Sequence, residues 1–181
     1  EQISFVKELE GKGYTYVIEK EGVYFDTSKL SDYGKLARLD IDGLKEGARL
    51  KVDGKKHPTD FAVWKFSPQD KNRDMEWDSP WGKGFPGWHL ECSVIARTNL
   101  GDQIHAHTGG IDHIPVHHTN EIAQTESVTG KQFSKFWLHN NHIKVNGTKM
   151  SKSLGNLYTI PDILNKGYDI QAFKVLVLSK H

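Results

Sequence analysis

The sequence has 181 residues and carries 24 basic against 23 acidic side chains, so its formal net charge is +1 at pH 7. With 36% hydrophobic residues, this balance excludes a disordered or strongly basic chain and predicts a globular protein with a sizeable core. The sequence has no bilayer-length apolar run, no signal-peptide pattern and no cysteine besides Cys92, which predicts a cytoplasmic protein without an intrachain disulfide.

The first half of the chain predicts a helix, a hairpin and a long irregular region. Apolar residues recur with helical spacing over 3–9 and two glycines follow, which favours an amphipathic helix. Residues 14–26 hold two β-rich runs around a charged turn, the pattern of a β-hairpin. The polar stretch from 27 to about 60 predicts loops and short elements. Residues 61–92 hold four of the five tryptophans among Gly and Pro, which we interpret as an irregular aromatic surface at a domain junction.

The second half alternates helices with strands. We expect a helix over 89–101, a strand over 102–110, a helix over 120–130 and a strand-like segment over 133–145. Such alternation predicts an α/β fold with a parallel sheet. Ligands of these sheets bind beyond the carboxyl ends of strands, where the glycine turn of the HTGG segment falls.

One candidate metal site emerges from spacing. His117 and Glu121 are four residues apart on one helical face, and His118 is three residues before Glu121. Zinc accepts imidazole, carboxylate and thiolate ligands, so Cys92 could complete a set of three. A solvated His–Glu pair and a buried inert cysteine fit the same spacing, and both interpretations stay open. The fourth ligand would be water, substrate or a residue elsewhere.

Three histidines, His105, His107 and His113, flank the glycine turn and suit a polar pocket for a charged substrate. Scattered core and surface histidines would look the same. The two glycines of TGGID would allow a ligand to approach the backbone, and Asp112 could accept hydrogen bonds from a ribose diol. A structural turn explains this pattern equally well.

The segment NGTKMSKSLGN, residues 146–156, is a glycine-flanked loop with two lysines. The ammonium groups of Lys149 and Lys152 could follow charge that builds up on a polyphosphate. A solvated surface loop is the alternative. We expect this loop and the histidine-rich segment before it to face one pocket.

Taken in order, GFPGWHLECS, GGID, HHTNEIAQTE and NGTKMSKSLGN resemble the second half of the catalytic domain of cysteinyl-tRNA synthetase, a class I aminoacyl-tRNA synthetase with the KMSKS signature. VYFDTSKLSDYGKL and MEWDSPWGKGFPGWH resemble the insertion of that family. The resemblance covers nearly the whole chain. It implies a partial Rossmann-like parallel sheet with helices, plus a small mixed α/β insertion subdomain. The implied divisions are the insertion at 1–85, the second Rossmann half at 86–136, and the KMSKS loop with the start of a helical stem-contact region at 137–181.

The resemblance also implies a zinc ion that binds the thiolate of substrate cysteine and so discriminates against serine, since a soft thiolate ligates zinc better than a hydroxyl. The ligands that match are Cys92, His117 and Glu121. The fourth family ligand, a cysteine, has no counterpart in this sequence. Trp88 would wall the cysteine pocket, with His107 near the bound amino acid.

For the nucleotide, the resemblance implies ATP as substrate, with Mg²⁺. Gly110 and Asp112 match the ribose-holding position, and His118 would line the adenylate site. Lys152, supported by Lys149, would be the catalytic residue that contacts the phosphates. The implied partners are L-cysteine, ATP and tRNA(Cys), with no membrane, in a monomeric parent protein.

Departures from the family pattern are Thr119 in HHTNE, where the family has glutamate, and IPVHH in place of an aromatic residue and proline before the histidine pair. The second signature motif of class I synthetases, the HIGH motif of the first Rossmann strand and helix, is also missing. This piece alone therefore lacks many of the residues that would bind the adenine and triphosphate of ATP. Glu1 at the start and the apolar periodic end, 172–181, predict a fragment. Two alternatives remain: a cysteine ligase that acts on a small amino-sugar acceptor, as in mycothiol biosynthesis, and a non-catalytic zinc- or substrate-binding module. NEIAQTE favours the synthetase.

Overall fold

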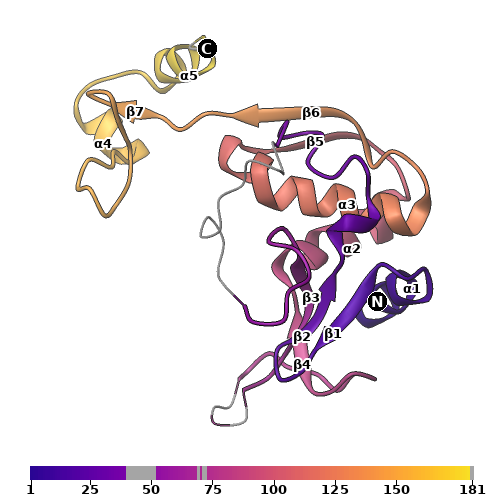
Figure 1. Ribbon diagram of the computed structural model, residues 1–181. Coiled ribbons are helices and arrows are strands. Elements are labelled where there is room, and N and C mark those ends of the chain that lie inside the picture. Colours follow the sequence, from indigo (N-terminus) through magenta and orange to yellow (C-terminus); the bar gives the residue numbers. More distant parts are fainter. Residues whose placement is uncertain (40–51, 69, 71–72, 180–181) are drawn as a thin grey trace. The chain divides into compact units, whose positions relative to one another are not determined.

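The computed structural model describes residues 1–39, 52–68, 70 and 73–179, which divide into two compact units, Glu1–His139 and Asn140–His181 (Figure 1). The helices are α1 (Gln2–Gly11), α2 (Trp88–Leu100), α3 (Thr119–Thr129), α4 (Ile160–Asn165) and α5 (Ile170–Leu178). The strands are β1 (Thr15–Ile18), β2 (Gly22–Phe25), β3 (Phe61–Phe66), β4 (Gly84–Pro86), β5 (Ile104–Gly110), β6 (Ser134–Asn140), β7 (Lys144–Val145) and β8 (Thr148–Lys149). No described helix combines the length and apolarity needed to span a membrane.

The first unit contains a four-stranded antiparallel sheet in the order β1, β2, β3, β4. The predicted hairpin is confirmed, because β1 pairs with β2 from Thr15 opposite Phe25 to Ile18 opposite Gly22. All four residues of β2 are buried, as expected of an inner strand covered on both faces. In the predicted irregular stretch after the hairpin, a 3₁₀ turn at Thr27–Lys29 is followed by further turns. The middle of that stretch, residues 40–51, lies outside the described residues.

The interpretation of the tryptophan-rich stretch was wrong at its start. Residues Phe61–Phe66 form β3, an inner strand that pairs with both β2 and β4. The side chain of Trp64 is only 1% exposed and belongs to the core, whereas Trp88 is 60% exposed. The short run FAVWKF carries the β-branched and aromatic residues of a buried strand. The Gly and Pro residues that follow this run conceal its strand signal.

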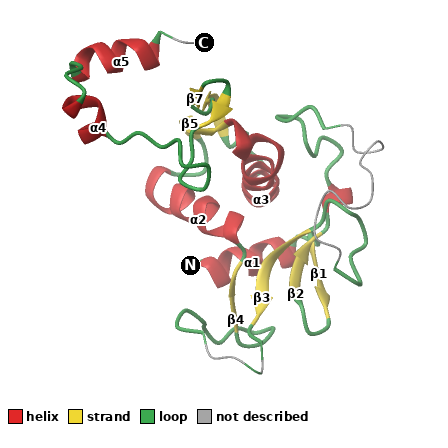
Figure 2. Cartoon of the chain, turned by 90° about the vertical axis from the view of Figure 1, so that its left-hand side faces the viewer, coloured by secondary structure: helices red, strands yellow, loops and turns green. Residues whose placement is uncertain are grey.

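The main core lies between the sheet and three helices (Figure 2). The predicted first helix is confirmed as α1, whose apolar stripe of Phe5, Val6 and Leu9 is buried. The remaining buried members come from β2, β3, α2, α3 and the turn after Lys29, and they are Val23, Phe25, Tyr33, Phe61, Val63, Trp64, Leu90, Val94, Ala123 and Val128. The helices that carry the candidate site residues are therefore fixed by the same core as the antiparallel sheet.

A second sheet follows in the chain, built from β5 and β6 with α3 between them. The backbone N–H of Ile104, the first residue of β5, donates to the carbonyl of Phe133, directly before β6, at 2.8 Å. The two strands thus start side by side, as in a parallel β–α–β unit. The predicted α/β fold is confirmed as a mixed α/β architecture. The parallel sheet is limited to this pair among the described residues, and the larger sheet is antiparallel.

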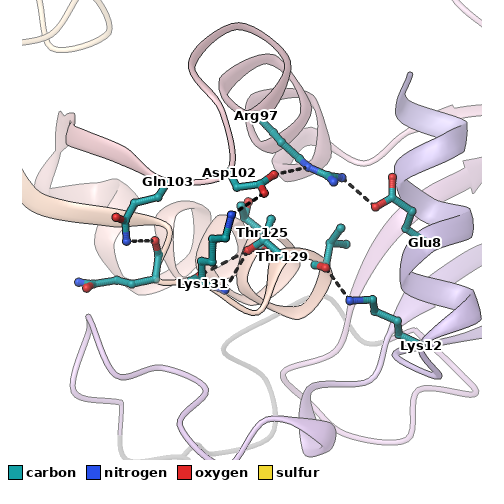
Figure 3. A network of polar contacts seen from close by, with 10 residues as sticks. Glu8, Lys12, Arg97, Asp102, Gln103, Thr125, Thr129 and Lys131 are labelled. Atoms are coloured by element: carbon teal, nitrogen blue, oxygen red, sulfur yellow. Dashed lines mark hydrogen bonds and ion pairs between the residues drawn. The ribbon is translucent and has the colours of Figure 1, made fainter.

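A polar network at the surface ties α1 to the ends of α2 and α3 (Figure 3). The guanidinium of Arg97 lies 2.9 Å from Oε2 of Glu8 and 3.1 Å from Oδ1 of Asp102. Lys131 then contacts the other oxygen of Asp102 at 3.0 Å. In addition, Nζ of Lys12 donates to the carbonyl of Val128 at 2.6 Å. These contacts join segments that are far apart in the sequence.

We expect Arg97→Met to lower the free energy of unfolding by about 1 kcal/mol or less, because partly exposed ion pairs contribute little and salt screens them. Lys131 and Arg97 lower the pKa of Asp102. The contribution of this carboxylate is therefore present above the ordinary carboxyl pKa and is lost as pH falls through the lowered, folded-state pKa. Urea unfolding of both proteins at neutral pH, in low and high salt, measures the effect. A loss that is equally large in high salt would contradict the ionic explanation.

The second unit, Asn140–His181, is small and has no fully buried residue among those described. Its β7–β8 hairpin pairs Lys144 with Lys149 and Val145 with Thr148. The hairpin turn, β8 and the residues after it form the segment 146–156, which we call the lysine loop. Two short helices follow. Thr159 caps α4 by accepting from the backbone N–H of Asp162, and Asp169 caps α5 by accepting from two backbone N–H groups.

Candidate active site

The approach of β4 to β3 determines where α2 begins. Gly87 precedes the helix in extended conformation, and its N–H donates to the carbonyl of Val63 at 2.9 Å. A Cβ at Gly87 would collide with the carbonyl oxygen of Ala62, so the strand can pass this closely only with glycine. The first helical turns of α2 then carry His89 and Cys92, three residues apart on one face.

The segment between β5 and α3 changes from a turn tighter than an α-helix to one that is wider. After a 3₁₀ turn at Ile111–His113, a π-helical turn at Ile114–His118 leads directly into α3. π-turns often lie at functional sites. The Thr119 hydroxyl donates to the carbonyl of Ile114 at 2.7 Å, across the wider turn. This bond gives Thr119, one departure from the family pattern, a structural role.

The structure brings Cys92, His117 and Glu121 together. Each offers a donor atom within 4.8 Å of the donor atoms of the other two. Nε2 of His117 lies 2.7 Å from Oε1 of Glu121. His117 and Glu121 are buried, and the Glu121 side chain is only 1% exposed. A thiol, an imidazole and a carboxylate therefore converge at one protected point.

Glu121 has a second imidazole neighbour, since its Oε2 lies 2.6 Å from Nε2 of His107. His107, His118 and Glu121 form a second group whose donor atoms lie within 4.8 Å of one another. Despite these short contacts, neither Glu121 oxygen has an aligned hydrogen-bond donor among the described residues. Buried carboxylate oxygens without such a donor are rare and call for an explanation, and a bound cation is one.

The charge states in this pocket follow from burial and neighbours. Burial acts to raise the pKa of Glu121, but the adjacent imidazoles of His107 and His117 outweigh it and lower the pKa. Burial raises the pKa of the Cys92 thiol, and the negative charge of Glu121 raises it further. Without a cation, the thiol therefore stays protonated at neutral pH. A bound divalent cation reverses this preference, because it stabilises the thiolate.

Two histidines that the sequence analysis did not assign complete the surroundings. Nδ1 of His89 lies 2.8 Å from Nδ1 of His117, and Nε2 of His139 lies 2.8 Å from Nδ1 of His118. Burial lowers the pKa of His118 to about 4, so its ring is neutral at pH 7. Partners of this kind orient metal-facing imidazoles. The spacing of His89 and Cys92 on one helical face was the signal that could have identified His89.

Trp88 and the glycine turn lie beside histidines of the same pocket, whereas His105 is exposed on β5. The ring of Trp88 lies 4.4 Å, centroid to centroid, from that of His117. Gly109 leaves room for a ring, because a Cβ there would stand 2.6 Å from Cε1 of His118. A Cβ at Gly110 would collide with the carboxylate of Asp112, which is exposed just after β5.

Lys149 and Lys152 lie in the second unit, Asn140–His181, with their side chains exposed. Lys149 ends β8, and Lys152 begins a turn in which the N–H of Gly155 donates to its carbonyl at 3.1 Å. The expectation that this loop and the histidine-rich segment face one pocket stays a prediction.

Comparison with known proteins gives one family for the whole chain. Residues 1–181 match the family described as tRNA synthetases class I (C) catalytic domain. The chain is 50% identical to Cysteine--tRNA ligase 1 of Burkholderia lata over 182 aligned positions, and 45% identical to Cysteine--tRNA ligase of Treponema denticola. It is also 50% identical over 180 positions to Cysteine--tRNA ligase of Clostridioides difficile. These alignments cover 99 to 100% of this chain but only 37 to 38% of each relative.

Proposed function

This chain belongs to the family of class I tRNA synthetase (C) catalytic domains, and we propose that it is part of a cytoplasmic cysteine–tRNA ligase. The carboxylate of L-cysteine would attack the α-phosphate of ATP, giving cysteinyl-AMP and pyrophosphate. The cysteinyl group would then move to the terminal adenosine of tRNA(Cys). The observation that supports this most directly is the convergence of Cys92, His117 and Glu121, whose donor atoms lie within 4.8 Å.

The proposed organisation follows the family. Residues 1–85 would be the insertion subdomain, 86–136 the second half of the Rossmann-like catalytic domain, and 137–181 the KMSKS loop with the start of the stem-contact region. The β5–α3–β6 unit supports the middle assignment, since a parallel pair joined by a helix is the repeating element of such a sheet. The antiparallel pairing of β1 to β4 supports a separate origin for the insertion.

The donor set fits a zinc ion, because zinc accepts sulfur, nitrogen and oxygen ligands and no described residue gives the Glu121 oxygens an aligned hydrogen-bond donor. Cys92, His117 and Glu121 would hold the ion in this chain. When bound, zinc supplies a Lewis acid with a preference for thiolate over hydroxyl, which would select cysteine against serine. His89, 2.8 Å from the far nitrogen of His117, would hold that ring in its ligating orientation.

The residues of the chain would position the other reactants. Trp88, which packs on His117, would form a wall of the amino-acid pocket, with His107 beside it. Gly110 and Asp112, at the end of β5, would hold the ribose of the adenylate, and His118 would line this site. Lys152, with support from Lys149, would neutralise the charge that builds on the leaving pyrophosphate of Mg²⁺-bound ATP.

Cysteine-dependent exchange of pyrophosphate into ATP by the full-length protein tests this proposal. We expect exchange with cysteine, none with serine, and charging of tRNA(Cys). Exchange without charging, but with transfer of cysteine to an amino-sugar acceptor, would identify the ligase paralogue instead. Zinc binding with no exchange at all would leave only a binding module.

Metal removal gives a further expected result. Among the residues that the structure describes, the proposed centre has three ligands, so water would complete the shell and the ion would be held less firmly than in a closed site. We expect dialysis against a strong chelator to strip zinc from this chain. Metal analysis before and after dialysis measures the loss. Stoichiometric zinc that survives the treatment would show that a further ligand exists.

A further inference from the structure

The lysine loop is tied at its base by one side chain, that of Asn156. Its Oδ1 accepts from the backbone N–H of Ser151 at 2.9 Å. Its Nδ2 donates to the backbone carbonyl of Lys149 at 3.1 Å. A single amide side chain therefore fills both a donor and an acceptor role, and it bridges the last residue of β8 and the far end of the loop.

The residues between Ser151 and Asn156 form a short turn. The N–H of Gly155 donates to the carbonyl of Lys152 at 3.1 Å, which closes a β-turn at the tip. At the base, the N–H of Met150 donates to the carbonyl of Ile143 at 2.8 Å, which fastens the loop to the hairpin. Lys152 is thus the first residue of a turn, and the hydrogen bonds of Asn156 to Lys149 and Ser151 hold the two ends of this loop together.

No hydrophobic burial stabilises this segment. Residues 152–155 are exposed, and Ser151 and Asn156 are only partly buried. Local order in such a loop depends on its hydrogen bonds, because few packed side chains oppose its conformational entropy. The two bonds of the Asn156 amide span five and seven residues, so they restrict the loop more than bonds between sequence neighbours.

We propose that Asn156 is a positioning residue that holds the lysine loop in shape, so that Lys152 is presented to the phosphates in the transition state. This inference rests on the proposed function for its catalytic consequence. The hydrogen-bond clamp itself does not depend on that function. Misplacement of a charge-stabilising group lowers the rate of the chemical step even when substrate still binds.

The catalytic test is Asn156→Ala in the full-length protein, measured by cysteine-dependent pyrophosphate exchange. We expect kcat to fall about tenfold, while the KM for ATP changes less than about threefold, because the lost interaction acts in the transition state. The matched control is Asn165→Ala, which removes an exposed asparagine of α4 in the same unit and should leave both values unchanged.

A double-variant cycle tests whether Asn156 acts through Lys152. If it does, Lys152→Ala with Asn156→Ala should be no slower than Lys152→Ala alone, since the clamp has no lysine left to present. Independent losses that multiply in the double variant would overturn the positioning role. An unchanged kcat in Asn156→Ala, with the wild-type protein active, would also overturn it.

Hydrogen exchange gives a readout that needs no activity. We expect the Ser151 amide to exchange at least about tenfold faster in Asn156→Ala than in the wild type. Asn156→Asp keeps the acceptor for this amide and should preserve much of its protection, although the donor to Lys149 is gone. Equal exchange in wild type and Asn156→Ala would show that the clamp does not order the loop. A wild-type protein without cysteine-dependent exchange, but with this protection pattern, would refute the proposed function and leave the clamp intact.

Discussion

Replacing Glu121 by glutamine in the full-length protein is expected to lower zinc affinity by about 100-fold or more and to abolish cysteine-dependent pyrophosphate exchange. Loss of an outer-shell partner typically costs 10- to 100-fold in metal affinity, so loss of a direct ligand should reach at least the upper end. Glutamine keeps the shape of the side chain but removes a buried charge that lies 2.6 Å from His107 and 2.7 Å from His117. Competition with a chromophoric chelator measures the affinity.

The matched control for this variant is Glu91→Gln on α2. Glu91 is exposed beside Cys92, and its negative charge, like that of Glu121, contributes to the raised pKa of the thiol. The control therefore removes the same charge next to the pocket without removing a ligand, and zinc affinity should change little. Cys92→Ser is a second ligand variant, in case the buried change at Glu121 disturbs folding. Wild-type zinc affinity in both ligand variants would rule out the proposed centre.

Much of the secondary structure could be predicted because each element has a local signal. The apolar stripe of α1, the hairpin of β1 and β2 and the glycine stops after α2 and α3 are read within a few neighbouring residues. The antiparallel order of β1 to β4 could not be read in this way. It depends on β3, which pairs with β2 across a stretch of more than 30 residues and lies in the region whose composition predicts an irregular surface. Pairing over such distances leaves little trace in local sequence patterns.

The candidate metal site could likewise be predicted only in part from local sequence. His117 and Glu121 could be paired by spacing alone, since one turn of helix separates them, although the first belongs to a π-helical turn. The approach of Cys92 from α2 depends on the packing of two helices, so zinc chemistry could only suggest this ligand and the family resemblance was needed to assign it. His89 and His139 escaped because their partners, His117 and His118, are 28 and 21 residues away.

Replacing Lys152 by alanine in the full-length protein should lower the rate of cysteinyl-adenylate formation by about 10²- to 10³-fold, the size seen when one charge-stabilising donor is removed. Its side chain is exposed on a turn and takes part in no ion pair among the described residues. The loss should therefore appear in the chemistry and leave the stability of the fold nearly unchanged. Pyrophosphate exchange and thermal unfolding of the same preparation separate the two effects.

Lys144→Ala is the control for this variant, because Lys144 is an exposed lysine of the β7–β8 hairpin in the same unit as Lys152. It removes the same charge from the same unit but lies outside the loop, so a general electrostatic effect on ATP would lower both rates alike. Lys149→Ala should fall between them if Lys149 only supports the phosphate contact. If Lys152→Ala exchanged pyrophosphate at the wild-type rate, the loop would be a solvated turn and the leaving group would need another cation.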